Sequence, residues 1–584
     1  MKRIAGILAT FLVAAVALVA LLFAVLPREA LKTQIGQQIS GWTGREVSLR
    51  GEPRIDFFPP LSVTLNDVTV SGPSGMTDAE IISMDRLTGT IRLAPLIIGR
   101  VEIDSFVLVR PLIRLVRDEA GGRNWAFDAG AAALQLAFAG DVPLGVFSLE
   151  GGTILYEDRQ SGETERLDSV NLTVEWTSVR APLAISGSAI WRGEQVMLTT
   201  NAAAPFAFLN DQVTPLEVRI ESAPVSVVFT GEAQDYPLPE FKGALKLSTV
   251  SLRRFANWLG SPIGPGSTLG QASLFGTAEF SNGVLSVADA ELTLDGNSAS
   301  GALEVTASTT PDIAGTLAFG ALDLTPYFGG LAAALSTAGD WREVELPTRW
   351  FRDMNADIRL SANTVKLGSL TAGATAATAS LREARLEIGL ARAEIDGGSL
   401  AGDVAFADAD IPHVEVRLRA NDIDLAGVGP AIGLPRSMTG SGSAVVDVAT
   451  GGRDLGSLID GLDGTARLDV RQGSVPLFGI AGIAATAGLV SDPGPADSLA
   501  PVPVEAASAG FTLSNGVAVL ERGKLVTSSY GAEMQGWIGL RDGTLGLNGT
   551  LQAAASGSAE ATPFPFGVEG TLADPQAEPQ ALAN

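Results

Sequence analysis

The sequence predicts a mainly β protein: an N-terminal transmembrane helix, followed by an elongated, curled, mostly antiparallel β-sheet groove with few short helices. Three observations predict it. Glycine (67 residues) and proline (31) are abundant in a 584-residue chain that is 46% hydrophobic. That composition suits short strands joined by glycine-marked turns better than a helical bundle. Beyond Val47 apolar and polar residues alternate, which is strand periodicity. The third observation is an uncharged N-terminal run.

This run covers residues 4–26 and reads IAGILATFLVAAVALVALLFAVL. About 20 apolar residues span a bilayer as a helix. The expected anchor positions are Ile4, Leu8, Phe11, Val16, Leu21 and Leu26. Residues 1–3 carry Lys2 and Arg3 and form the predicted cytoplasmic tip, because positive charge stays inside. A single-pass inner-membrane protein follows, with its N-terminus cytoplasmic and its bulk in a Gram-negative periplasm.

A cleaved signal peptide is the alternative interpretation of the same run. Ala15-Val16-Ala17 has the small-x-small pattern of a cleavage site, but it lies in the middle of the run. The run also exceeds the signal core of about 7–15 residues. We therefore favour an uncleaved anchor.

The rest of the chain divides by its periodicity. Residues 27–43 repeat apolar side chains at helical spacing and form a predicted juxtamembrane helix. Residues 491–508 are rich in Pro, Ala and Asp, which predicts a loop, and the C-terminal end is predicted to be disordered. The expected regions are an N-terminal β region (44–190), a middle β-groove region (191–350), a C-terminal β region (351–573) with the loop near 491–508, and a disordered tail (574–584).

Strands and turns are marked locally. In residues 413–419, Val414, Val416 and Leu418 point one way and the polar side chains the other; residues 465–471 repeat this. In residues 61–70 the alternation slips at Asn66-Asp67, which predicts a bulge or a turn. Residues 252–259 and 455–462 are predicted short helices. Five dipeptides are typical of two-residue hairpin turns: Asn282-Gly283, Asp295-Gly296, Asp396-Gly397, Asn515-Gly516 and Asp542-Gly543. We interpret them as a degenerate hairpin repeat, not a strict tandem array.

Charge and composition exclude several functions. The chain has 40 Lys+Arg against 65 Asp+Glu, a net charge of −25, which argues against nucleic acid as a partner. It has no cysteine and one histidine, His413, which alternates with apolar residues on a polar strand face. The pairs Asp408/Asp410 and Asp422/Asp424 could serve a glycosidase or bind calcium, although a solvated face or a turn explains them more simply. We expect no enzyme and no cofactor.

A sheet with one apolar face needs something to cover that face. At about 12 residues per strand and turn, the chain provides roughly 45 strands. Open sheets rarely pass about 10 strands without curling, so a trough is expected. Acyl chains are a suitable filler, because each buried CH₂ contributes about 0.8 kcal/mol. The candidate lining residues are Val63, Leu65, Ile358, Leu360, Val414, Val416, Leu418, Leu468 and Val470.

Several phrases resemble the AsmA family. Residues 44–68 resemble its opening element, and residues 93–103 (LAPLIIGRVEI) resemble its L-x-P-L phrase. Further matches, in order, are residues 111–115 and 121–125 (GGRNW), 149–158 (LEGGTILYED), 462–473 and 567–575. The family often continues after Gly473 with a helix, whereas here residues 482–508 are interrupted by Gly and Pro.

The resemblance implies an inner-membrane protein with a large periplasmic β-rich body. Such proteins are similar to bridge-like lipid transporters, which carry phospholipid toward the outer membrane and support outer-membrane assembly and envelope integrity. The implied partners are phospholipid acyl chains, the inner membrane through the N-terminal helix, and proteins of either membrane. A non-transporting scaffold for outer-membrane protein assembly is the alternative. A hydrolase using Asp408 and Asp410 is the least favoured.

Overall fold

The computed structural model describes residues 47–49, 51, 54–56, 60–72, 80–92, 103–125, 143–208, 210–234, 239–261, 268–306, 310–327, 352, 354–429, 438–476, 478–491, 499–554 and 563–580. The contacts divide the chain into two units, Met1–Thr249 and Val250–Asn584, which we describe separately. In the described ranges no helix is both long and apolar enough to cross a membrane. The predicted anchor positions and the predicted helix 27–43 lie outside these ranges.

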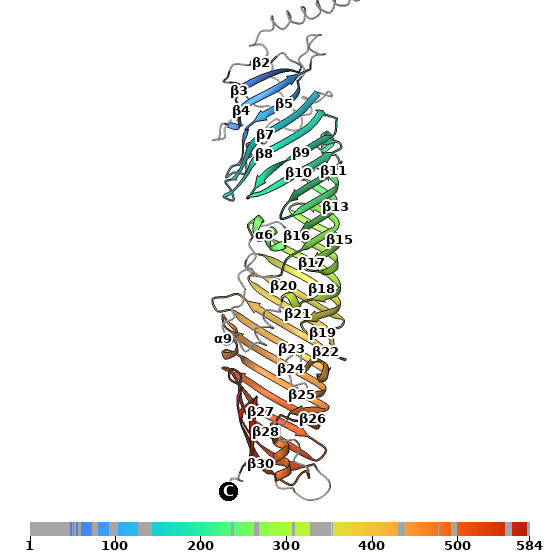
Figure 1. The fold of residues 1–584 in the computed structure, drawn as a ribbon, viewed down its shortest axis with the longest axis vertical. Coiled ribbons are helices and arrows are strands. Elements are labelled where there is room, and N and C mark those ends of the chain that lie inside the picture. Colours follow the sequence, from blue (N-terminus) through green and yellow to red (C-terminus); the bar gives the residue numbers. More distant parts are fainter. Residues whose placement is uncertain are drawn as a thin grey trace, which may run out of the picture. The chain divides into compact units, whose positions relative to one another are not determined.

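The first unit is a sheet of thirteen described strands (Figure 1). Strands β1 and β2 both pair with β3, and β5 and β6 both pair with β4. These pairs and the other pairs are antiparallel, except that β7 runs parallel to both β5 and β6. The elements are β1 (Val47–Leu49), β2 (Arg54–Asp56), β3 (Leu61–Ser71), β4 (Glu80–Ile91), β5 (Ile103–Val109), β6 (Leu112–Arg117), β7 (Pro143–Asp158), β8 (Glu163–Ser178), β9 (Leu183–Trp191), β10 (Glu194–Ala202), α5 (Pro205–Phe208), β11 (Thr214–Ser222), β12 (Ser226–Gln234) and β13 (Glu240–Thr249).

The slip at Asn66-Asp67 is a distortion inside strand β3. Asp67 has φ +52°, and the buried positions change from Leu65 to Val68, three residues on. The ladder to β4 nevertheless keeps its register, with Asn66 opposite Arg86 and Val68 opposite Met84. The predicted bulge or turn is therefore absent at this point, and the irregularity is the positive φ of Asp67.

The second unit continues the same construction with eighteen described strands (Figure 1). Its strands pair antiparallel apart from the parallel pair β17 and β18. The elements are α6 (Leu252–Leu259), β14 (Ala272–Ser281), β15 (Val284–Leu294), β16 (Asn297–Thr306), β17 (Asp312–Asp323), β18 (Asn355–Leu367), β19 (Leu370–Ala372), β20 (Thr375–Arg382), β21 (Arg385–Ile395), β22 (Gly398–Ala407), β23 (His413–Asp424), α8 (Leu425–Val428), β24 (Thr439–Gly451), α9 (Leu455–Asp460), β25 (Asp463–Pro476), α10 (Ile480–Thr486), β26 (Pro501–Ser514), β27 (Val517–Val526), β28 (Tyr530–Gly539), β29 (Thr544–Ala553), β30 (Phe564–Thr571) and β31 (Asp574–Pro579).

The predicted turns and helices are largely confirmed. Four of the five dipeptides form two-residue hairpin turns with both residues at positive φ, as their types require. The fifth, Asp542-Gly543, ends a four-residue connection, residues 540–543. Helix α6 has the predicted bounds, and the Ser251 side chain caps it by accepting from the Arg254 N–H. Helix α9 begins as predicted and ends two residues earlier, at Asp460.

Two predictions about irregular segments are wrong. Strand β26 starts at Pro501, so the predicted loop 491–508 includes the first half of a strand. Strand β31 occupies Asp574–Pro579, where disorder was expected. In both places pairing with a neighbouring strand satisfies the backbone and outweighs a proline-rich composition. Residues 480–486 are helical even though Gly482 interrupts the pattern there.

The second unit contains a repeat with an offset of 101 residues. Strand β15 (Val284–Leu294) corresponds to β21 (Arg385–Ile395), β16 starts at Asn297 and β22 at Gly398, and β17 ends at Asp323 as β23 ends at Asp424. The turn Asp295-Gly296 corresponds to Asp396-Gly397 at the same offset. The hairpin repeat therefore has a strict period here, which sequence inspection missed.

Each copy ends in the same way. The Asp323 carboxylate accepts from the Thr325 N–H, and the Asp424 carboxylate accepts from the Ala426 N–H, so both strands turn directly into a capped helical turn. Beneath each helical turn lies the Asp-Gly hairpin turn of its own copy. In the first copy the Tyr327 hydroxyl donates to Asp295 over 2.9 Å; in the second the Asp424 N–H donates to the Asp396 carbonyl over 3.1 Å.

Candidate functional site

The predicted lining residues of the second unit lie together on one face of the sheet. Strand pairing aligns Ile358 with Val416 through the ladder Leu303, Gly315, Ile358, Ala379, Ile388, Val404, Val416, Val448, Gly464 and Leu513. The next ladder on the same face is Gly301, Leu317, Leu360, Ala377, Leu390, Gly402, Leu418, Val446, Ala466 and Phe511. We call these two ladders and their flanking positions the apolar face of the second unit.

The flanking positions hold the other candidates. Val414 lies beside Phe406 on one flank. Leu468 lies between Ala444 and Ala509 on the other, and Val470 lies beyond it, beside Ala507. Seven of the nine predicted residues are thus brought to one surface by strand register. Neither ladder contains a polar side chain, so these two rows are apolar across ten neighbouring strands.

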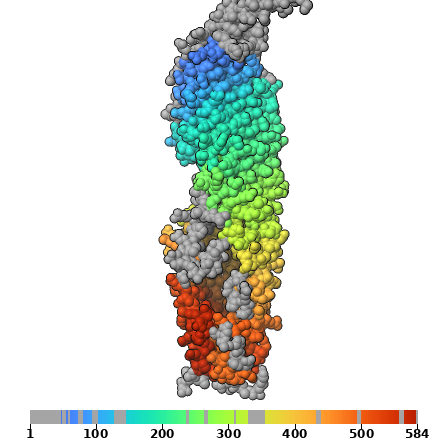
Figure 2. All heavy atoms as spheres, in the orientation of Figure 1, coloured from blue at the N-terminus to red at the C-terminus, as the bar shows by residue number. Residues whose placement is uncertain are grey.

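This face is only partly shielded from solvent. The large side chains of its central strands are half-buried: Ile358, Leu360, Ile388, Leu390, Val404, Val416, Leu418, Val446 and Val448. Leu468, whose side chain points to the same face, is 45% exposed. In Figure 2 the surface of the second unit is recessed beside its yellow and orange strands. An apolar surface of this extent is typical of a place where an apolar partner binds.

The opposite face is polar. Arg417 lies between Asp403 and Asp447 on neighbouring strands and forms an ion pair with Asp447 at 3.5 Å. Arg417 also pairs with Glu415 at 3.3 Å, as Arg385 does with Glu387 at 2.7 Å. These pairs are largely exposed, so each contributes little stability. The sheet therefore has one polar, solvated face and one apolar face.

Some positions on the apolar face have no room for a side chain and are occupied by glycine. A Cβ at Gly402 would collide with the carbonyl oxygen of Arg417 and lie 2.9 Å from the Leu418 Cα. Gly301, its counterpart 101 residues earlier, would collide in the same way with Thr316 on β17. Gly402 also has φ +147°, which disfavours any other residue. At these points only glycine leaves room for the backbone of the next strand, which carries a leucine opposite it.

The first unit has an apolar face of its own. One ladder runs through Val174, Ile185, Thr200, Val218, Phe229 and Leu245. The next runs through Leu172, Gly187, Leu198, Ile220, Val227 and Leu247. Apart from Leu245, which is buried, the large side chains here are half-buried. No candidate was predicted on these strands, although residues 216–220 and 196–200 show the same alternation.

Val63 and Leu65 do not belong to an open surface. Each is 1% exposed, in a core that also contains Val68, Leu87 and Phe106. Alternation alone predicted them as lining residues, but both side chains are buried in a cluster with residues of β4 and β5. Their assignment to the lining is wrong. The anchor positions lie outside the described residues.

The apolar face of the second unit ends in a closed core. Its Leu418 ladder continues from Phe511 through Leu520, Gly536 and Leu547 to Val568. Leu520, Leu547 and Val568 are at most 4% exposed, in contrast to the half-buried positions on β18–β24. They share a cluster with Ile480, Ile483 and Ala484 of helix α10. The helix is thus part of what covers the face there.

Three of the four paired carboxylates, those of Asp408, Asp422 and Asp424, have structural roles. Asp408 pairs with Arg352 at 2.7 Å, Asp422 pairs with Arg471 at 2.5 Å, and Asp424 caps α8. His413 lies at the start of β23, 3.6 Å from Glu415, and its side chain is 44% exposed. Over the described ranges no group of three or more His, Asp or Glu side chains could hold a metal ion. None of these residues forms a recognisable reaction centre.

The motif residues of the N-terminal region lie in a structural network of hydrogen bonds and ring contacts. Asn124, fully buried, accepts from the Val116 N–H and donates to the Arg114 carbonyl, both over 2.9 Å, so its side chain pairs like an extra strand residue. The Trp125 ring lies 6.0 Å from that of Tyr156. The G-x-x-N-W motif therefore stabilises the fold, because it ties the loop after β6 to that strand and to β7.

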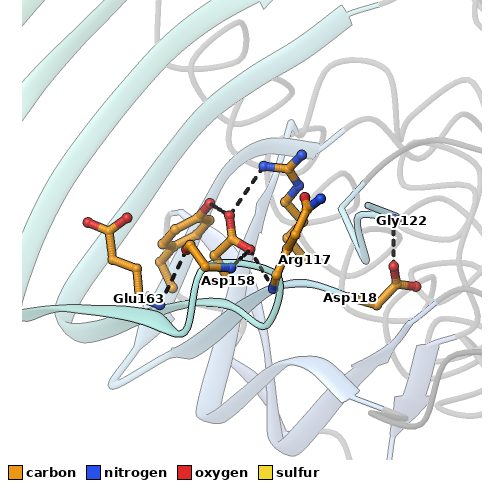
Figure 3. A network of polar contacts seen from close by, with 8 residues as sticks. Arg117, Asp118, Gly122, Asp158 and Glu163 are labelled. Carbon is orange, nitrogen blue, oxygen red and sulfur yellow. Dashed lines mark hydrogen bonds and ion pairs between the residues drawn. The ribbon is translucent and has the colours of Figure 1, made fainter. Parts of the chain in front are cut away.

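Asp158 is the charged centre of the same network. Only 6% exposed, it accepts from the N–H groups of Gln160 and Ser161 over 2.9 and 3.2 Å and pairs with Arg117 at 3.2 Å (Figure 3). Burial raises the pKa of Asp158, but the hydrogen bonds from Ser161 and Gln160 and the charge of Arg117 outweigh it and hold that pKa below its usual value. An ionised carboxylate thus closes the turn between β7 and β8.

Comparison with known proteins adds the family. The profile of the AsmA family matches residues 1–218 and 236–522, most of the chain. No curated protein and no solved structure matches it. The matched residues include the network around Asp158 and the apolar face of the second unit as far as β26. The chain belongs to the AsmA family.

Proposed function

We propose that this AsmA-family protein is anchored in the inner membrane and carries phospholipids toward the outer membrane, with their acyl chains on its apolar faces. The uninterrupted apolar ladders of the second unit are the observation that carries the proposal. Polar or charged side chains on such a path would have to be desolvated by every passing chain, at a cost. On these ladders a passing chain meets only apolar side chains and glycines.

Open sheets with this many strands curl. A curl toward the apolar face makes a trough whose inside is hydrocarbon-like and whose outside carries the Arg–Asp and Arg–Glu pairs. Acyl chains gain about 0.8 kcal/mol per buried CH₂ wherever they lie in it. Because this attraction has no direction, chains slide along the ladders without a specific site, and headgroups stay in water. Supply of lipid in this way supports outer-membrane assembly and envelope integrity.

Two apolar side chains on neighbouring strands test the proposal. Leu468 on β25 points to the apolar face and Val445 on β24 to the polar face, and each is 45% exposed. A photo-crosslinking amino acid is introduced at one position or the other in the full-length protein in cells, and adducts are analysed by mass spectrometry. We expect phospholipid adducts at position 468 and none at 445.

Equal exposure makes Val445 a matched control for chance contact with lipid or detergent. Adducts at both positions in equal yield would show that the two faces do not differ. Adducts at neither, together with cross-links to envelope proteins, would favour the non-transporting scaffold instead.

A further inference from the structure

Helix α10 occupies the apolar face at the point where that face closes. The Leu418 ladder is half-buried on β23 and β24, and buried on β27, β29 and β30. Ile480, Ile483 and Ala484, each at most 5% exposed, belong to the cluster that covers it. Phe511 and Val470 pack against this cluster at its boundary. The helix thus lies where hydrocarbon chains would otherwise continue along the ladder.

The helix has little to hold it besides this packing. It is seven residues long, and its N-cap, Gly479, makes no side-chain hydrogen bond to the first turn. Helices this short are unstable alone in water. Both ends are marked by glycine in the left-handed region, Gly479 at φ +82° and Gly488 at φ +73°. Whatever competes for the surface under Ile480 and Ile483 therefore competes with the helix itself.

We propose that α10 is a displaceable plug: acyl chains that reach β25 and β26 compete with it for the same apolar surface, and its displacement opens the path to β27–β30. This inference rests on the proposed lipid transport and adds its regulation. A phospholipid chain has the chemistry that matches Ile480 and Ile483, since it is apolar and needs no hydrogen-bond partner. With the plug in place, the open face ends at Phe511.

Two glycine-to-alanine changes three residues apart test the plug with opposite signs. Gly482 is exposed inside α10, and a Cβ there meets no atom within 4 Å, so Gly482→Ala stabilises the helix. Alanine at Gly479 is strained by the positive φ, so Gly479→Ala destabilises its start. A Gly-to-Ala change in a helix alters the open population by about two- to fivefold.

The assay uses the full-length protein in vesicles of phosphatidylethanolamine and phosphatidylglycerol. Amide exchange of residues 480–486 is followed by mass spectrometry, with lipid-free detergent as the reference. Cross-linking to lipid is measured at Phe511, at the edge of the plug, and at Leu468. We expect lipid to speed exchange in α10, and cross-linking at position 511 to fall with Gly482→Ala and rise with Gly479→Ala, each by about two- to fivefold.

The outcomes separate the two ideas. If both variants shift cross-linking at 511 in the same direction or leave it unchanged while Leu468 still captures lipid, the plug is refuted and the transport proposal stands. If no lipid is captured at Leu468 either, the transport proposal itself fails. Unchanged exchange in α6 checks that the second unit remains folded in both variants.

Discussion

The 101-residue repeat predicts that one copy can be excised from the second unit. Deletion of residues 324–424 joins Asp323 to Leu425, so the Asp-Leu junction that follows β23 is restored after β17. Strand β17 then meets β24 in the place of β23. The register of β23 puts Gly315 opposite Val448 and Leu317 opposite Val446, so apolar residues face apolar residues. We expect a folded protein with a shorter sheet.

The shortening follows from the ladder. Between Thr277 on β14 and Thr465 on β25, the pairing passes through β15, β16, β17, β18, β20, β21, β22, β23 and β24. Ten strand steps of about 4.8 Å become five, a loss of about 24 Å. The chain has no cysteine, so Thr277→Cys and Thr465→Cys carry the only spin labels, and both positions are exposed. Pulsed electron paramagnetic resonance measures the distance.

A matched deletion checks the phase of the repeat. Deletion of residues 324–413 removes eleven residues fewer than the first deletion. It fuses Asp323 to Val414, so β17 runs into β23 without a turn. We expect this variant to aggregate or to lose its thermal transition. An excised repeat that fails to fold, or that folds with the label distance unchanged, would show that the 101-residue offset is not a structural period.

Three further predictions concern single side chains. Gly402→Ala places a Cβ against the Arg417 carbonyl and should destabilise the β22–β23 pair by about 1–3 kcal/mol, which is measured as faster amide exchange. Gly510→Ala is the control, because a Cβ there meets nothing within 4 Å, and it should leave amide exchange unchanged. Because the pKa of Asp158 is lowered in the folded state, its carboxylate stabilises the fold at pH values above about 3.9, the ordinary pKa of aspartate, and this contribution is lost as the pH falls further. Asp158→Asn should therefore flatten the acid dependence of the melting temperature of the first unit. An unchanged profile would contradict the role of the network. Burial and the hydrogen bond to Asp295 raise the pKa of Tyr327 from 10.0 to about 12, so its contribution to stability is complete below pH 10 and is lost between pH 10 and 12. Tyr327→Phe should therefore weaken the loss of stability at alkaline pH, measured by urea titration. An identical loss in the variant would show that Tyr327 is not its source.

Several features were predictable because they depend on neighbouring residues. Positive φ at Asn282-Gly283 and Asp396-Gly397 is a local requirement, and so is the alternation that places Val416 and Leu418 on one side of β23. The short helix after Val250 was visible for the same reason, since Ser251 caps it and its apolar residues recur with helical spacing. These signals need no knowledge of which strands meet.

Other features could not be predicted from local pattern. Val63 and Val416 follow the same alternation, yet Val63 is 1% exposed in a core and Val416 is half-buried on an apolar face. What differs is the set of elements that pack above them. The 101-residue period was missed because only a few positions, among them Asp295 and Asp396, keep the same residue, while others differ even in polarity, as Asp289 and Leu390 do.

The sequence alone determined that this chain makes many strands, that each has one apolar side, and where most hairpins turn, because φ preferences and side-chain alternation act between near neighbours. Tertiary structure alone decided which apolar sides remain half-buried and which are closed in a core, as around Val63 and Val568. Burial depends on contacts between residues far apart in the chain, and those contacts are fixed only when strand register and packing are complete.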